Sequence, residues 1–301
     1  MPLSILTILG KVLLSLVFIV VITVILSIAA AVIAILKQPE LERSLAAVAG
    51  DSFFIKAALW AQIIGFVGGV FLSYGIFERR KGWTLGLQIR HFGRRFGEGF
   101  AAGALLITVS CIGIWLLGGI RMLSIPWTES MLLELVSGFL LFIGVAVNEE
   151  LFARGYLQGL VKERFGRSPA IAVSTLVFAL LHSFNPGMWS TPMPLLNLIL
   201  AGLLFGVSRE LSKGLWMPIG MHLSWNFMQG CVFGFQVSGT PMPSILKAEA
   251  QGNVLLSGGS FGAEGSLVTT IILVVGILLV MNYYGQIARK TPANRAYLKH
   301  K

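Results

Sequence analysis

The chain has 301 residues, of which 55% are hydrophobic and only 12% charged, and its mean hydropathy is +0.82. A soluble domain of ordinary composition is far less apolar, so a soluble globular protein is excluded. The formal charge of +10 could indicate a nucleic-acid partner, but the basic residues fall in connections between apolar runs, which argues against nucleic acid and indicates membrane topology instead.

Apolar runs long enough to cross a bilayer, about 20 residues each, follow one another along the chain. We expect spans at roughly 12–36, 54–77, 98–119, 131–150, 169–185, 194–208, 215–236 and 265–285. The fourth is expected to continue past its polar residues to about Leu160. The sequence therefore predicts an all-α, polytopic integral membrane protein of about eight transmembrane helices, with residues 1–301 forming a single membrane domain.

Basic residues gather in alternate connections between these spans. They are Arg79, Arg80, Lys81, Arg90, Arg94 and Arg95 after the second span, Lys162, Arg164 and Arg167 after the fourth, Arg209 and Lys213 after the sixth, and Arg289, Lys290, Arg295, Lys299 and Lys301 in the tail. The positive-inside bias places such segments in the cytoplasm. We therefore expect a multi-pass protein of the cell membrane, surrounded by lipid, with both termini cytoplasmic.

The longest polar connection on the opposite side runs over roughly 237–264 and is rich in proline and glycine, which favours loop and turns. The sequence does not indicate what this connection does. Gly202 and Gly206 in the sixth span have the spacing that lets helix backbones approach closely, and we expect them to hold the seventh span in place. Cys111 and Cys231 lie inside spans and are expected to be packing residues.

Three short polar patches interrupt the apolar spans. They are Glu149-Glu150-x-x-x-Arg154, Phe178-x-x-x-His182 and His222-x-x-x-Asn226. An ionisable group within a span is costly and indicates a functional site, with packing inside the bundle as the competing explanation. A single histidine or a single Glu–Arg pair is more often structural, but such groups in three separate helices favour one shared site.

The spacing within the patches predicts a division of roles. Adjacent helical residues point about 100° apart, whereas residues four apart share a face. Glu150 is thus placed to pair with Arg154, which offsets part of the cost of burying both charges. Glu149 is left to face another helix, where a desolvated carboxylate near imidazoles can act as a general base on water.

The three patches are expected to lie at similar depth, because a helix rises about 1.5 Å per residue. His222 and Asn226 are one turn apart on one face, and both are suited to stabilise an oxyanion that forms at a peptide carbonyl. Alternatively, Glu149, His182 and His222 could hold a zinc ion whose fourth ligand is water. The sequence leaves both arrangements open.

At these residues the chain resembles the CAAX protease and bacteriocin-processing family of intramembrane proteases, also called abortive-infection proteins, which includes the type II CAAX prenyl endopeptidase. The resemblance covers about residues 131–230, which we take as the protease core. The residues that carry it are Glu149, Glu150, Arg154, Gly155, Tyr156, Phe178, His182, Gly202, Phe205, Gly206, Leu215, Trp216, His222 and Asn226.

The resemblance implies an all-helical membrane core that hydrolyses peptide bonds with water. Glu149 would activate the water and His182 would orient it, with Glu150 and Arg154 in support. His222 and Asn226 would stabilise the oxyanion. Members are often called metalloproteases, while a glutamate mechanism without metal has also been argued, so the resemblance leaves zinc as an open cofactor.

The sequence therefore predicts an intramembrane endopeptidase that cleaves a membrane-associated or lipid-modified, CAAX-like peptide from a cavity open toward the cytoplasmic half of the bilayer. One alternative is a non-catalytic immunity or scaffold protein that binds a peptide in the same polar cavity. Another is a proton-coupled transporter, since buried Glu and His also form proton relays. The sequence shows neither an internal repeat nor paired broken helices, which argues against a transporter.

Overall fold

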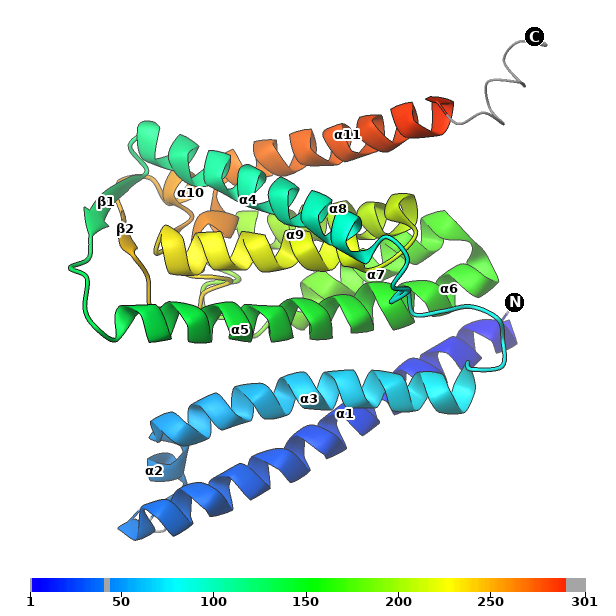
Figure 1. Cartoon of the computed structure of the whole chain (residues 1–301), viewed down its shortest axis with the longest axis horizontal. Helices are drawn as coiled ribbons and strands as arrows, with labels where there is room; N and C mark the ends of the chain where they lie inside the picture. The colour runs from blue at the N-terminus through cyan, green and yellow to red at the C-terminus, as the bar shows by residue number, and fades with distance from the viewer. Residues whose placement is uncertain (1, 41–43, 291–301) are drawn as a thin grey trace.

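The computed structural model describes residues 2–40 and 44–290 and is almost entirely helical (Figure 1). The longer helices are α1 (Pro2–Lys37), α3 (Ser52–Phe77), α4 (Phe92–Leu116), α5 (Met131–Glu150), α6 (Gln158–Phe165), α7 (Arg167–Leu181), α8 (Met193–Ser212), α9 (Trp216–Phe227) and α11 (Leu267–Lys290). Short helices are α2 (Leu45–Gly50), α10 (Val254–Ser257), η4 (Gly259–Phe261) and η5 (Ala263–Gly265), and two π-helical segments are η2 (Leu151–Leu157) and η3 (Met228–Val232).

Within the described residues, six helices are long and apolar enough to cross a membrane, rather than the eight expected. They are Ile5–Lys37, Ser52–Phe77, Phe92–Leu116, Met131–Phe165, Met193–Ser212 and Leu267–Ile287. The expected spans at 169–185 and 215–236 are the shorter helices α7 and α9. Helix α7 ends at Leu181, where His182 turns the backbone out of the helix, and the helical run of α9 ends in η3. The chain is a multi-pass membrane protein.

The fourth span continues past its polar residues, as expected, and runs from Met131 to Phe165. Its middle is the π-helical segment η2, which begins directly after Glu149 and Glu150. A π-helical turn inserts extra backbone into an α-helix and commonly marks a functional site. The second π-helical segment, η3, likewise follows soon after Asn226.

Helix α9 lies at the centre of the bundle, between α4 and α5 (Figure 1). Its residues from Met217 to Asn226 are all buried, so it is covered on every side by protein. Gly99 and Gly103 of α4 allow this, because a Cβ on either would overlap a backbone carbonyl of α9, that of Met217 or that of Met221. Small residues at such positions let membrane helices approach closely.

The expected role of Gly202 and Gly206 in holding the seventh span is wrong. Gly202 of α8 packs on Thr175, and Gly206 packs on Ile171, both of which belong to α7. Their close approach therefore fixes the helix that carries Phe178 and His182. Contact with α9 at the site comes from other residues of α8.

We expect Gly103→Ala to lower the free energy of unfolding by about 1–3 kcal/mol, the usual cost of overpacking a tight contact. The added methyl group would meet the Met221 carbonyl and the Ser224 hydroxyl. Thermal unfolding in detergent measures the effect. Gly97→Ala on the same helix is the matched control, because a Cβ there meets no neighbouring atom within 4 Å. Equal melting temperatures for the two variants would contradict the packing described.

A polar cluster at the end of α3 joins this helix to α1. Glu78 is buried and forms an ion pair with Lys11 of α1, accepts a hydrogen bond from Trp83 Nε1 at 3.1 Å, and lies 3.3 Å from Lys81 Nζ. Burial opposes ionisation of Glu78, but the hydrogen bonds from Lys11 and Trp83 outweigh it and hold the pKa below its ordinary value of 4.5. The ionised carboxylate therefore stabilises the α1–α3 hairpin.

Because the folded-state pKa of Glu78 is lowered, its stabilising effect is fully present above the ordinary pKa of 4.5 and is lost as the pH falls through the lower folded value. We expect the parent protein to lose more thermal stability than Glu78→Gln as the pH falls from neutral to well below 4.5. Glu129→Gln, at an exposed carboxyl group, is the control. A Glu78→Gln variant with the same acid dependence as the parent would show that this cluster does not contribute.

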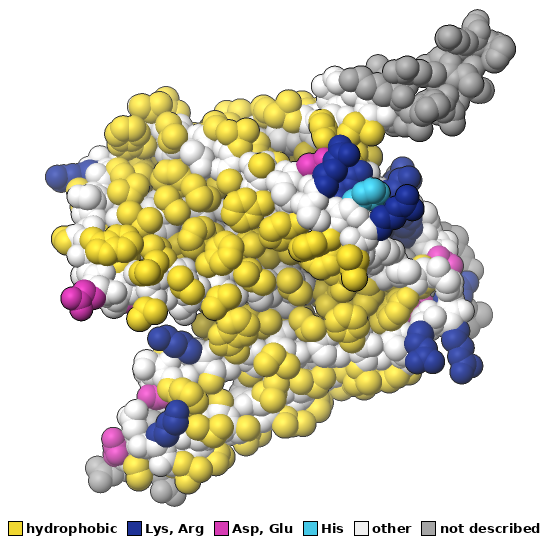
Figure 2. All heavy atoms as spheres, viewed as in Figure 1, with side chains coloured by type: hydrophobic (Ala, Val, Ile, Leu, Met, Phe, Trp, Pro, Cys, Tyr) yellow, Lys and Arg dark blue, Asp and Glu magenta, His cyan; other side chains and the backbone are white. Residues whose placement is uncertain are grey.

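The two ends of the molecule differ in structure and charge. One end carries β1 (Ile120–Ser124) and β2 (Leu246–Ala250), an antiparallel pair in which Ile120 lies opposite Ala250. The other end carries the basic connections, and Figure 2 shows Lys and Arg side chains gathered there beyond a wide hydrophobic surface. The expected basic tail falls largely outside the described residues, which end at 290.

Candidate active site

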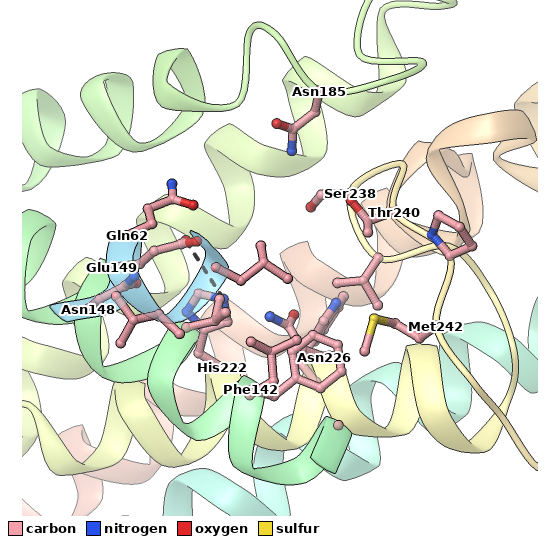
Figure 3. Close-up of a pocket in the computed structure, with 18 of the residues that line it drawn as sticks. Gln62, Phe142, Asn148, Glu149, Asn185, His222, Asn226, Ser238, Thr240 and Met242 are labelled. Atoms are coloured by element: carbon pink, nitrogen blue, oxygen red, sulfur yellow. Dashed lines mark ion pairs between the residues drawn. The ribbon is translucent and has the colours of Figure 1, made fainter. Parts of the chain in front are cut away.

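The structure brings all three polar patches together inside the bundle. The Glu149 carboxylate, on α5, has its Oε2 atom 3.8 Å from His182 Nε2 and 4.0 Å from His222 Nε2. Figure 3 shows Glu149 and His222 facing each other, with Asn226 beside them in the same pocket. Glu149 Oε2 is buried and has no hydrogen-bond partner among the described residues. A buried carboxylate oxygen without a partner is what a bound water or substrate would satisfy.

The neighbouring Glu150 lies on a different face of the helix and meets the other nitrogen of the His222 ring. Its Oε1 atom accepts a hydrogen bond from Arg154 Nη1 at 2.8 Å and lies 3.1 Å from His222 Nδ1. Glu150 and Arg154 are both fully buried, and Arg154 Nη2 also donates to the Gly202 carbonyl at 3.2 Å. The Glu150 carboxylate thus ties α5 to α9, and its partner Arg154 ties η2 to α8.

Two phenylalanines enclose these charged groups. The Arg154 guanidinium lies over the ring of Phe178 at 4.1 Å, and the Phe205 ring stacks on His222 with centroids 5.1 Å apart. Phe178 also contacts His182. The second patch therefore supplies an aromatic support for the ion pair as well as an imidazole. The sequence indicated Phe178 and Phe205 as motif residues but did not indicate these contacts.

The hydrogen-bond partners of each imidazole identify one nitrogen that carries a proton. His182 Nδ1 lies 2.9 Å from the Phe178 carbonyl oxygen, which can only accept, so Nδ1 is the protonated nitrogen. His222 Nδ1 faces the Glu150 carboxylate and donates for the same reason. A ring that carries only this proton presents its Nε2 lone pair to Glu149. A water or substrate group placed between Glu149 Oε2 and these two Nε2 atoms would then have three hydrogen-bond acceptors around it.

The donor types suit zinc, because zinc sites use imidazole nitrogens and carboxylate oxygens, with the other ring nitrogen held by a carbonyl or carboxylate. In the part of the chain that the structure describes, however, His, Cys, Asp and Glu side chains do not form a group of three that could hold a metal ion. Glu149, His182 and His222 are thus chemically suitable ligands in an arrangement that does not make a metal cluster. Their zinc-binding role stays a prediction.

The site lines a cavity of about 740 Å³. Its wall near Glu149 includes Asn226, Asn148 and Gln62, and Figure 3 shows Gln62 and Asn148 on either side of Glu149. Gln62 belongs to α3, and sequence reasoning missed it. The available signal was a single amide inside an otherwise apolar span.

The expected opening toward the basic, cytoplasmic half is not what the structure shows. From Glu149 the cavity follows α5 back to Ser130, and it reaches Ile55 at the start of α3 and Thr240 in the long loop. These residues lie at the end that carries β1 and β2. Sequence reasoning had no measure of which side of the site is filled by side chains, so it placed the opening on the wrong side.

The sequence that forms this site can be compared with known protein families. Residues 130–228 match the family model of the type II CAAX prenyl endopeptidase Rce1-like proteins. The match spans α5 to α9 and therefore contains every predicted site residue. A comparison with curated proteins gave no match.

The Rce1-like match implies a protease of the CAAX type in a membrane setting. It confirms the resemblance found in the sequence motifs. The helices outside the matched segment, α1 to α4 and α11, contribute Gln62 to the site and Gly99 and Gly103 to its packing.

Proposed function

We propose that the protein is an intramembrane endopeptidase that hydrolyses a peptide bond of a membrane-associated or lipid-modified peptide with a water molecule activated by Glu149. The observation that carries this proposal is the position of the Glu149 carboxylate, which faces two imidazole Nε2 atoms at about 4 Å across a cavity large enough for a peptide segment. Its supports are the Rce1-like match and the membrane-spanning helices.

A water between Glu149 and His182 would donate one hydrogen to the carboxylate and the other to Nε2. Both atoms are acceptors in the neutral imidazole state, and the 3.8 Å between them leaves no direct hydrogen bond. Glu149 then takes a proton from the water as it attacks the peptide carbonyl carbon. The same carboxyl group returns that proton to the leaving amine.

Asn226 and His222 act on the carbonyl oxygen of the substrate. The Asn226 side chain is one turn from His222 on α9 and lines the same cavity, so its amide can donate to the oxyanion. When His222 is doubly protonated, Nδ1–H stays on Glu150 and Nε2–H becomes a second donor. Glu150 and Arg154 hold that ring in place and do not contact the substrate.

A zinc ion, when bound by Glu149, His182 and His222, would polarise the carbonyl and lower the pKa of a bound water. The steps above use only the side chains. A chelator separates the two chemistries: loss of cleavage with a chelator, restored by added zinc, assigns the cofactor. Unchanged cleavage assigns the glutamate mechanism without metal.

The test is cleavage of farnesylated and unmodified membrane peptides by the purified, detergent-solubilised protein. We expect Asn226→Ala to lower kcat by about 10²–10³-fold, the usual cost of removing one oxyanion donor, with a smaller change in KM. Asn282→Ala, an exposed amide on α11, is the control. An Asn226→Ala enzyme with the parent kcat would remove Asn226 from the proposed mechanism.

The non-catalytic alternative predicts a different pattern. A peptide-binding immunity or scaffold protein would retain peptide bound in the cavity and release no cleaved product. Peptide recovered intact from the parent protein, across all substrates tried, would favour that function over proteolysis.

A further inference from the structure

A second pocket, of about 680 Å³, lies at the basic end of the bundle and shares no described residue with the cavity at Glu149. It is formed where α8 ends and where α4, α7 and α9 begin, together with residues near the end of α11 (Figure 1). The basic side chains in its wall are Arg90, His91, Arg95, Arg167 and Lys213. Among the described residues, Glu210 is the one acidic side chain that lines it.

The carboxylate of Glu210 is already occupied by other cations. Its side chain is only 2% exposed, and its Oε2 atom lies 2.6 Å from Lys162 Nζ and 3.3 Å from Arg167 Nε. The other oxygen, Oε1, forms an ion pair with Arg209. Three cations therefore share one carboxylate, and Glu210 does not neutralise the pocket.

Two of the basic side chains, Arg90 and Lys213, have no ion-pair partner among the described residues, and both are exposed. The backbone that presents these cations is unusual. Lys213, which caps the end of α8, has a φ of 61°, and His91, at the start of α4, has a φ of 64°. Non-glycine residues rarely adopt this conformation, and it is concentrated at functional sites. In the described part of the chain, two of the three such residues line this pocket.

Three helix starts add to the positive potential of the pocket. Helices α4, α7 and α9 begin with no side-chain cap and with no acidic residue in the first turn. Their first residues or N-caps, His91, Arg167 and Trp216, all line the pocket. The free N–H groups of a first helical turn and the positive end of the helix dipole both favour an anion. The unpaired cations and the helix starts therefore favour the same ligand, a group with several anionic oxygens such as a phosphate.

Large apolar side chains lie beside these charges. Ile89 is 83% exposed and Phe92 is 42% exposed, on either side of the two basic residues between them in the chain. Leu211, Trp216 and Ile287 line the pocket itself. The Trp216 indole N–H donates to the backbone carbonyl of residue 88 at 2.8 Å, so the ring is fixed at the rim, as in an interfacial aromatic belt. A free anion has no use for this apolar surface, whereas a lipid covers it.

We infer that this pocket binds the phosphate group of an anionic phospholipid in the leaflet at the basic end of the bundle. The positive-inside bias makes this the cytoplasmic leaflet, which is the anionic one. The phosphate compensates the charges of Arg90 and Lys213, and an acyl chain lies over Ile89 and Phe92. Because the pocket joins the ends of α4, α8, α9 and α11, a bound lipid holds α9, the helix that carries His222, in its place. The inference does not depend on the proposed reaction.

The experiment measures thermal unfolding of the full-length protein in detergent micelles, at fixed ionic strength, as phosphatidylglycerol is added. Phosphatidylcholine is the neutral lipid and inorganic phosphate is the free anion. A ligand of the folded state raises the melting temperature according to the ratio of its concentration to Kd. We expect phosphatidylglycerol to raise the melting temperature of the parent. The double variant Arg90→Gln with Lys213→Gln should need about 30-fold more of this lipid for the same rise, since each basic residue contributes about fivefold.

The matched control is Arg79→Gln with Arg80→Gln, which removes the same charge from exposed residues at the same end but outside the pocket. It should respond to phosphatidylglycerol as the parent does, and so should the charge-retaining variant Arg90→Lys with Lys213→Arg. Each variant is compared with its own melting temperature without lipid, which separates lipid binding from any change in the fold.

Three results would overturn the inference. One is an equal loss of response in the two Gln double variants, because the lipid would then be attracted by net charge and not bound in the pocket. Another is the absence of a rise in the parent, or an equal rise with phosphatidylcholine. The third is an equal rise with inorganic phosphate that Arg90→Gln with Lys213→Gln abolishes, because the pocket would then take a soluble anion instead of a lipid.

Discussion

Replacing Glu149 by Gln is expected to lower the rate of peptide cleavage by about 10²–10⁴-fold, the usual contribution of a general base. The amide has nearly the same shape as the carboxylate but cannot take a proton from water. Glu149 makes no hydrogen bond to the described residues through Oε2 and is partly exposed to the cavity, so the substitution breaks no buried ion pair. The melting temperature in detergent should therefore remain close to that of the parent.

The measurement compares cleavage and thermal unfolding on the same preparations. Glu163→Gln is the matched control, since Glu163 lies on the same continuous helix, is exposed and does not line the cavity. That variant should cleave as the parent does. A Glu149→Gln protein that cleaves at the parent rate would remove Glu149 from the mechanism, and with it the water activation proposed above.

Replacing Arg154 by Met is expected to lower the free energy of unfolding by about 3–5 kcal/mol, the usual cost of leaving one buried charge without its partner. Arg154 and Glu150 have no exposed surface, and their side chains are 2.8 Å apart. The loss also removes the hydrogen bond to the Gly202 carbonyl and the contact with Phe178. Chemical or thermal unfolding in detergent measures the change.

Two further variants test whether burial of the Glu150–Arg154 pair causes the expected loss of stability in Arg154→Met. Arg94→Met breaks a Glu–Arg pair four residues apart on α4 whose arginine is 63% exposed, and it should cost no more than about 1 kcal/mol. The double variant Glu150→Gln with Arg154→Met removes both charges and should recover part of the lost stability. If Arg154→Met and Arg94→Met had the same free energy of unfolding, the buried Glu150–Arg154 pair would contribute no more to stability than an exposed pair.

The candidate site could be located from the sequence because its chemistry is costly in a membrane. Charged and amide groups at four-residue spacing stand out against apolar runs, and the pairing of Glu150 with Arg154 follows from helix geometry alone. The all-helical class followed from composition for the same reason. These predictions depend on neighbours within one helix, which a single sequence specifies.

The predictions that did not hold depend on contacts between helices. Gly99 and Gly103 have the same spacing as Gly202 and Gly206, yet only the first pair packs on α9. Likewise, Phe152 and Leu133 are equally apolar, but Phe152 is buried among packed side chains whereas Leu133 lines the cavity. Hydropathy does not distinguish protein-facing from lipid-facing or cavity-facing side chains, so the number of spans and the side of the opening required coordinates.

The contact of Glu150 with both Arg154 and His222 has a consequence for how the protein is made. Glu149 and Glu150 are in α5, whereas His222 and Asn226 come about 70 residues later, in a helix too short and too buried to be held by lipid alone. A nascent chain that has inserted α5 but not docked α9 has its carboxylates without their imidazole and amide partners. On the proposed mechanism, the hydrolytic site is therefore complete only after α9 has docked against α5.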